Sequence, residues 1–183
     1  LFRSKAFMDA GKSERDAITW TAQLAEKSGF TLYRHGEQYA PGDRVYVNNR
    51  GKALYLAVIG REKLSEGFHM AAAHIDAPHL HIKPHPLFED SELGYLKTHY
   101  YGMVRKHQWL AIPLELRGVF VLKDGTVRRV AIGQDPGDPL LTMTDLLPHL
   151  AQSQDEKPLG KAIEGEQMNL LIGSRPLAGS EGA

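Results

Sequence analysis

The spacing of the apolar residues changes along the chain, and this change restricts the class of fold. Residues 13–28 predict an amphipathic helix, because Ile18 and Ala25 recur at helical spacing. Ser13 is the candidate N-cap at its start. The runs RVYVNN and ALYLAVIG follow, rich in β-branched and aromatic residues, with the hairpin signal NNRGK between them. A helix followed by packed strands predicts an α/β arrangement.

A third apolar run, FHMAAAHID, ends in the first chemically suggestive pair. Its small apolar residues predict a buried strand, in which His74 and Asp76 would point to the same face. The carboxylate would then be close enough to reach an imidazole N–H. A metal-binding histidine usually gives its second ring N–H to such an acceptor, so H-x-D suits a ligand and its orienting carboxylate. One histidine does not build a zinc site, which needs three or four ligands.

The stretch AAAHIDAPHLHIKPHP contains four histidines in all, and two interpretations of the three after His74 stay open. His79, His81 and His85 could form a local metal site. Alternatively, they could face water in a loop interrupted by prolines. The sequence favours the loop, because the prolines interrupt regular backbone structure.

The character of the chain changes near residue 86. The segment WLAIPLELRGVFVLKDGTVRRVAIG predicts two or three strands, with a tight turn at residues 123–125. A loop rich in Pro, Gly and Asp follows, and then a short helix that Thr144 would cap. The sequence therefore predicts an α/β segment over residues 1–86 and a mainly β segment over residues 87–183.

Composition excludes several classes of protein. The 183 residues carry 22 basic and 22 acidic side chains, so there is no net field to attract nucleic acid or an anionic membrane. Without cysteine, any metal must bind through nitrogen or oxygen. No apolar run is long enough to span a bilayer, and the first residues are too charged for a signal-peptide core. We therefore expect a cytoplasmic protein. The start at Leu1 suggests processing or a piece of something longer.

Four segments together resemble one known family. They are AAAHIDAPHLHIKPHPLFED, LKTHYYG, QWLAIPLELRGVFVLKDG and TMTDLLPHL, and they extend in order over nearly the whole chain. They resemble the aspartyl aminopeptidase family, its bacterial branch in particular. These are metallo-aminopeptidases with two co-catalytic divalent ions of the zinc type. The resemblance implies that His74 ligates one metal and that Asp76 is a catalytic-site residue that orients it.

The resemblance also implies an architecture. Residues 1–86 would be the N-terminal portion of an α/β-sandwich metallopeptidase domain, and residues 87–183 an incomplete inserted lid and dimerisation domain. In related enzymes a histidine in the stretch LLPHLA reaches the neighbouring subunit's active site and helps to hold substrate. Here that residue is His149. The alternative is a helix-end histidine that interacts with the last carbonyls.

The implied activity is hydrolysis of the N-terminal residue of peptides, acidic residues among them, by a water that two metals activate. A catalytic Glu and the remaining metal ligands of the family would follow residue 183, so we expect this chain to be incomplete and inactive alone. The expected partners are peptide substrates and further copies of the same chain, as a dimer through the lid or a dodecamer. The competing hypothesis is a non-catalytic dimerisation module derived from that family.

Overall fold

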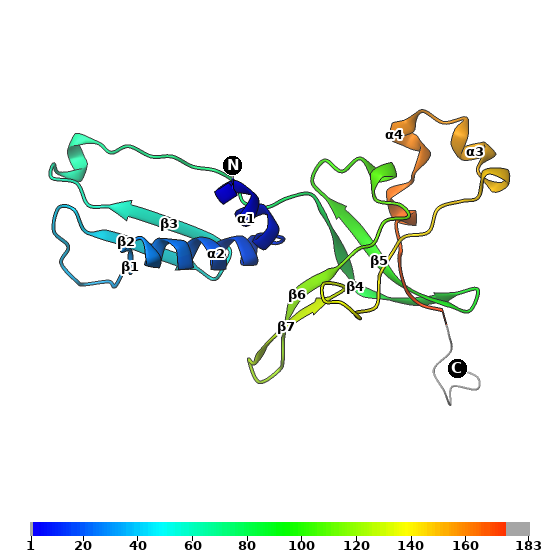
Figure 1. Cartoon of the computed structure of the whole chain (residues 1–183), viewed down its shortest axis with the longest axis horizontal. Coiled ribbons are helices and arrows are strands. Elements are labelled where there is room, and N and C mark those ends of the chain that lie inside the picture. The colour runs from blue at the N-terminus through cyan, green and yellow to red at the C-terminus, as the bar shows by residue number, and fades with distance from the viewer. Residues whose placement is uncertain (1, 175–183) are drawn as a thin grey trace. The chain divides into compact units, whose positions relative to one another are not determined.

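A computed structural model describes residues 2–174, and the chain divides into two compact units, Leu1–Ala77 and Pro78–Ala183. Figure 1 shows the elements of each unit. The division falls earlier than the predicted boundary at residue 86. The reason is that residues 79–90 form one continuous strand, which belongs wholly to the second unit.

The first unit contains two helices and a three-stranded sheet of order β1-β2-β3. Strand β1 is parallel to β2, and β2 is antiparallel to β3. A single 3-10 turn follows the sheet. The elements are α1 (Phe2–Ala10), α2 (Glu14–Lys27), β1 (Thr31–Leu32), β2 (Arg44–Asn49), β3 (Ala53–Val58) and η1 (Leu64–Glu66).

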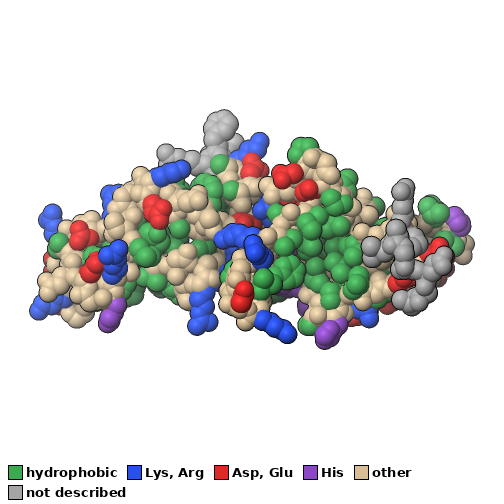
Figure 2. All heavy atoms as spheres, turned by 90° about the horizontal axis from the view of Figure 1, so that it is seen from below, with side chains coloured by type: hydrophobic (Ala, Val, Ile, Leu, Met, Phe, Trp, Pro, Cys, Tyr) green, Lys and Arg blue, Asp and Glu red, His purple; other side chains and the backbone are tan. Residues whose placement is uncertain are grey.

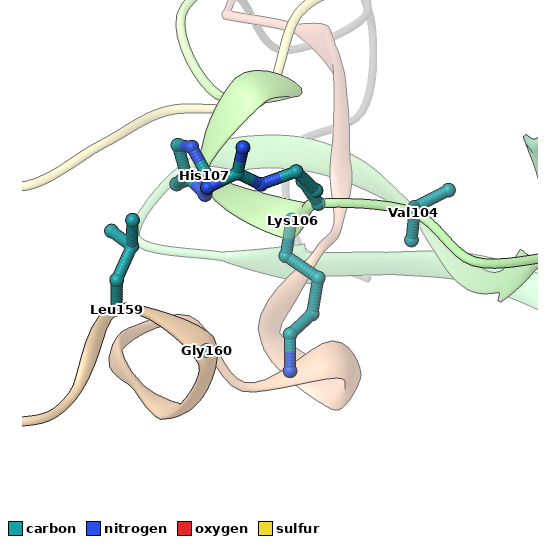
Figure 3. A pocket seen from close by; sticks show the side chains of 6 residues that line it. Val104, Lys106, His107, Leu159 and Gly160 are labelled. Atoms are coloured by element: carbon teal, nitrogen blue, oxygen red, sulfur yellow. The ribbon is translucent and has the colours of Figure 1, made fainter.

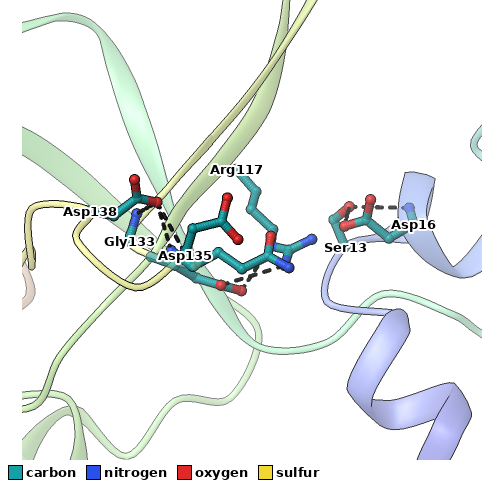
Figure 4. Close-up of polar contacts among 8 residues, drawn as sticks. Ser13, Asp16, Arg117, Gly133, Asp135 and Asp138 are labelled. Carbon is teal, nitrogen blue, oxygen red and sulfur yellow. Dashed lines mark hydrogen bonds and ion pairs between the residues drawn. The ribbon is translucent and has the colours of Figure 1, made fainter.

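Helix α2 confirms the predicted helix and its cap. The Ser13 hydroxyl accepts a hydrogen bond from the Asp16 backbone N–H at 3.3 Å and donates one to the Asp16 carboxylate at 2.7 Å (Figure 4). This satisfies one of the N–H groups that a helix leaves unpaired at its start. Ile18 and Ala25 are buried, as their spacing predicts. Gly29 follows the helix with a φ of 84°, a conformation that glycine adopts without strain.

The predicted hairpin of the first unit is also present. Strands β2 and β3 pair from Arg44 opposite Val58 to Asn49 opposite Ala53. The turn between them holds both central residues, Arg50 and Gly51, at positive φ. Such turns match the twist of the two strands, which explains why the sequence NNRGK forms one.

The second unit contains a three-stranded antiparallel sheet of order β4-β5-β8 and a separate two-stranded hairpin. Short helical turns connect them. The elements are β4 (His79–Asp90), β5 (Leu93–Tyr101), η2 (Lys106–Gln108), β6 (Leu116–Val121), β7 (Val127–Ile132), η3 (Pro148–Leu150), α3 (Gln152–Asp155), α4 (Leu159–Ala162), η4 (Gly165–Gln167) and β8 (Leu170–Gly173).

Strand β4 corrects the prediction of a proline-broken loop. It pairs with β5 on both sides of a register shift between Ile82 and Leu87. Pro84 and Pro86 lie within this shift, where the ladder does not require their missing N–H groups. The prolines therefore interrupt the pairing locally without ending the strand.

The core of the second unit forms beside this sheet. Met143, Ile163 and Met168 are buried there, and four partly buried residues pack around them: Leu80, Trp109, Leu110 and Leu114. Thr98 of β5 is 3% exposed, and its hydroxyl donates a hydrogen bond to the Met168 carbonyl. One face of β4 and β5 therefore faces the core.

The hairpin β6–β7 confirms the predicted strands and the turn at residues 123–125. Gly125 has a φ of 84°, and the Leu122 N–H donates to the Thr126 carbonyl at 2.8 Å. In the loop after β7, one carboxylate oxygen of Asp138 accepts three backbone N–H groups at 3.0–3.1 Å, from Gly133, Gln134 and Asp135 (Figure 4). These hydrogen bonds hold the pKa of Asp138 below its ordinary value.

Two predictions about secondary structure are wrong. Residues 68–76 are not a strand, and Phe68 and Met70 are 69% and 77% exposed. Among residues 2–174 no strand lies alongside this segment to form a ladder with it. The predicted helix capped by Thr144 is absent as well. The chain turns helical only at Pro148, because proline disfavours helical conformation in the preceding residue, and Leu147 accordingly has a ψ of 150°.

No helix within residues 2–174 has both the length and the apolar character needed to cross a membrane.

Candidate functional site

His74 and Asp76 contact each other at the end of the first unit. The His74 Nδ1 atom lies 3.0 Å from the Asp76 backbone oxygen and 3.2 Å from its carboxylate Oδ1. Both oxygens are acceptors, so Nδ1 must carry the proton. The neutral ring then has its lone pair on Nε2, the nitrogen that would face a metal. The contact expected from H-x-D thus forms in an irregular segment, without the strand that was predicted to produce it.

The His74 side chain is more exposed to solvent than the Asp76 side chain that it contacts. The His74 side chain is 85% exposed, whereas that of Asp76 is 40% exposed. The ring is therefore held at Nδ1 while most of its surface remains open to a ligand. This arrangement can orient a single imidazole donor toward an ion.

The residues present fit part of a metal site. A structural or catalytic zinc ion takes at least three protein ligands. Across the described part of the chain, no group of three or more His, Asp or Glu residues could hold an ion. His74 therefore fits as one ligand and Asp76 as the group that fixes its tautomer, and residues 2–174 do not complete the coordination.

His149 lies in the second unit, in the 3-10 turn Pro148–Leu150, and its side chain is exposed. It occupies the last turn, where a histidine is well placed near terminal carbonyls. Its role in a neighbouring subunit stays a prediction.

The histidines of β4 have an arrangement that the sequence interpretation missed. His79 and His81 contact each other, with their Nε2 atoms 3.0 Å apart. Their rings also lie against Tyr101, with centroids 4.9 Å and 5.5 Å from its ring. The sequence could have predicted this contact, because residues two positions apart, such as His79 and His81, point to the same face of a strand. His85 lies within the register shift, and within the described residues it does not complete a three-histidine site.

A small open pocket of about 200 Å³ lies between η2 and α4 (Figure 3). In Figure 3 the Leu159 side chain points toward His107, while Lys106 extends away from them. The Lys106 ammonium lies 5.8 Å from the centre of the Tyr100 ring. The lining is basic, so it would attract an anionic group more than a cation. The lining residues are Val104, Arg105, Lys106, His107, Leu159 and Gly160.

The H-x-D pair can supply one ligand of a metal site, and comparison with known families identifies the class as zinc metalloproteases. Residues 7–181 match the family model described as Aminopeptidase I zinc metalloprotease (M18). The chain therefore belongs to the M18 aminopeptidase family. This confirms the resemblance and the α/β fold class drawn from the sequence.

Individual relatives agree with this assignment. A probable M18 family aminopeptidase 1 of Clostridium acetobutylicum is 47% identical to this chain. The alignment covers 98% of this chain and 39% of the relative. The crystal structure of an M18 aminopeptidase from Thermotoga maritima superposes with a TM-score of 0.88 at 38% identity, covering 98% of this chain and 40% of that one. The chain thus spans about two fifths of the length of these relatives.

A more distant solved structure is the S. cerevisiae mApe1 dodecamer. It matches at 16% identity with a TM-score of 0.64, covering 91% of this chain and 36% of that one. At this identity the match shows a shared fold alone.

Proposed function

We propose that the protein carrying this chain is a metallo-aminopeptidase that hydrolyses the N-terminal residue of peptides. Membership of a zinc metalloprotease family supports the class of reaction. The observation in the structure that carries the proposal is the pair His74 and Asp76, in which Nδ1 is held at 3.0–3.2 Å and Nε2 is left as the donor atom.

In this proposal the protein uses two divalent metal ions, which we take to be zinc. When bound, such ions act as Lewis acids and lower the pKa of a bound water. His74 would hold one ion through Nε2. Asp76 would keep the proton on Nδ1 and fix the ring orientation, a role that typically changes metal affinity or activity by about 10–100-fold.

The remaining metal ligands and the catalytic glutamate are proposed to lie outside these 183 residues. This explains why the described part of the chain contains a single fitted ligand, and it agrees with coverage of 39% of a relative. We propose that the chain by itself does not turn over peptides. The first unit, which ends at Ala77, would belong to the catalytic domain, and the second unit, which contains the whole of β4, to a lid. His149 would contact substrate in a neighbouring subunit of a homo-oligomer, and the location would be cytoplasmic.

The direct experiment compares the full-length gene product with the 183-residue chain. Both are loaded with zinc and supplied with peptides that begin with Asp, Glu or Leu. We expect release of the N-terminal residue by the full-length protein, with acidic residues among its substrates, and none by the chain. Turnover by the chain alone would contradict the proposed division of the active site. No turnover by the full-length protein would contradict the enzyme assignment.

A second candidate is a non-catalytic dimerisation module. It is favoured by apolar side chains left exposed on the β6–β7 hairpin, where Phe120 is 61% and Val121 68% exposed. Figure 2 shows hydrophobic side chains gathered at the surface on the face viewed from below. Large exposed apolar patches often mark protein interaction sites. Sedimentation separates the two functions, because a stable dimer of the full-length protein that binds no zinc would favour the module.

A further inference from the structure

Four side chains with polar or aromatic rings share the outer face of strands β4 and β5. His79 lies directly opposite Tyr101, and His81 lies directly opposite His99. Directly paired residues of antiparallel strands point to the same face. The alternate residues, represented by Leu80, pack toward the core. The fold itself therefore places this group of rings away from the core.

The distance between the two β4 histidines matches bidentate binding of a metal. Their Nε2 atoms lie 3.0 Å apart. Two imidazole nitrogens bound to one ion at about 2.05 Å are separated by this distance when the angle at the metal is about 94°. That angle is close to the right angle of tetragonal coordination, which is typical of Cu²⁺ and Ni²⁺, and well below the tetrahedral angle preferred by zinc.

The backbone already holds both rings in place for binding. They lie two residues apart on one strand, and both lie against the Tyr101 ring. In the metal-free state the 3.0 Å contact is a hydrogen bond in which one ring donates and the other accepts. A metal ion would use both nitrogen lone pairs, so its binding would displace the shared proton and weaken at acid pH.

We propose that His79 and His81 form a bidentate site for a divalent transition metal of tetragonal geometry, with water at the remaining positions. Cu²⁺ would bind more tightly than Ni²⁺ or Zn²⁺, following the general order of divalent affinities. This site uses neither His74 nor Asp76, and it does not depend on the proposed peptidase function.

The test titrates the purified chain with Cu²⁺ alone. Electron paramagnetic resonance would report nitrogen coordination, and sub-stoichiometric Cu²⁺ would broaden NMR signals near the site. His81→Ala is the main variant, because its side chain is exposed and its loss leaves the core intact. His79→Gln is the second, and circular dichroism checks the folding of both. His85→Ala, on the same strand, is the matched control, and His74→Ala shows whether the tightest Cu²⁺ site lies instead at the His74 and Asp76 pair.

We expect the two site variants to lose at least about tenfold in affinity at the tightest Cu²⁺ site, equivalent to about 1.4 kcal/mol, while His85→Ala stays within about twofold. The first broadened signals should be those of His79, His81 and Tyr101. The proposal is overturned if His81→Ala binds Cu²⁺ as the unmodified chain does. It is equally overturned if His74→Ala removes the tightest site while His81→Ala retains it.

Discussion

Replacement of Thr98 by valine tests how the second unit is held together. Thr98 is buried in β5, and its hydroxyl donates to the carbonyl of Met168, which is also buried. This bond joins β5 to the segment that leads into β8, across 70 positions of sequence. Thr98→Val keeps the shape of the side chain but replaces the hydroxyl with a methyl group, so the Met168 carbonyl loses this donor.

The expected loss follows from two opposing effects. Leaving a buried acceptor without its donor costs about 1–3 kcal/mol. The added methyl group recovers at most about 0.8 kcal/mol through burial. If the methyl group recovers this full amount, the net loss in free energy of unfolding is about 0.2–2.2 kcal/mol. Thr98→Ser retains the donor and removes one methyl group, so it should stay within about 1 kcal/mol of the unmodified chain.

Urea unfolding measures this loss through tryptophan fluorescence. The chain has two tryptophans, and Trp109 packs against the core of the second unit. A Trp20→Phe background leaves Trp109 as the reporter. With a urea slope of about 2 kcal/mol/M, Thr98→Val should lower the midpoint by about 0.1–1.1 M. An unchanged or higher midpoint for Thr98→Val would refute the structural role given to this hydrogen bond.

Three further predictions concern packing, capping and pH. Gly165→Ala places a Cβ 2.9 Å from Cδ1 of Tyr100, so thermal unfolding should show a loss of about 1–3 kcal/mol; a wild-type melting curve would refute this contact. Ser13→Ala removes the cap of α2 and should cost about 1 kcal/mol in urea unfolding, which an unchanged midpoint would contradict. The Tyr46 phenol donates to Glu26 at 2.5 Å, which raises its pKa. This stabilisation is complete below about pH 10 and is lost as pH rises through the raised pKa; urea midpoints of wild type and Tyr46→Phe between pH 9 and 11 should therefore converge.

Local signals in the sequence were sufficient for the elements whose geometry is set by a few adjacent residues. Ser13 followed three positions later by Asp16 starts a helix because the Ser13 hydroxyl accepts the Asp16 backbone N–H and donates to the Asp16 carboxylate, which orients the cap. The positive φ at Gly51 and Gly125 closes two hairpins for a comparable reason. These features depend little on the rest of the fold.

Elements that depend on distant partners were predicted less well. The apolar composition of residues 68–76 indicates a strand, but a strand forms only where another strand offers its hydrogen bonds. The opposite error occurred at β4. Pro84 and Pro86 led to the prediction of a loop, but pairing with β5 keeps residues 79–90 in one strand. The His74 and Asp76 contact was predictable because two residues of separation suffice for it. Its metal-binding role depends on further ligands that spacing alone does not reveal.

Zinc content and peptide turnover of the full-length protein, measured with His74→Ala, test the central claim most directly. His69→Ala is the matched control, since His69 is an exposed histidine of the same irregular segment. We expect His74→Ala to lose stoichiometric zinc and turnover together, Asp76→Asn to lose about 10–100-fold in affinity or activity, and His69→Ala to retain both. Retention of full zinc content and turnover by His74→Ala would contradict the account.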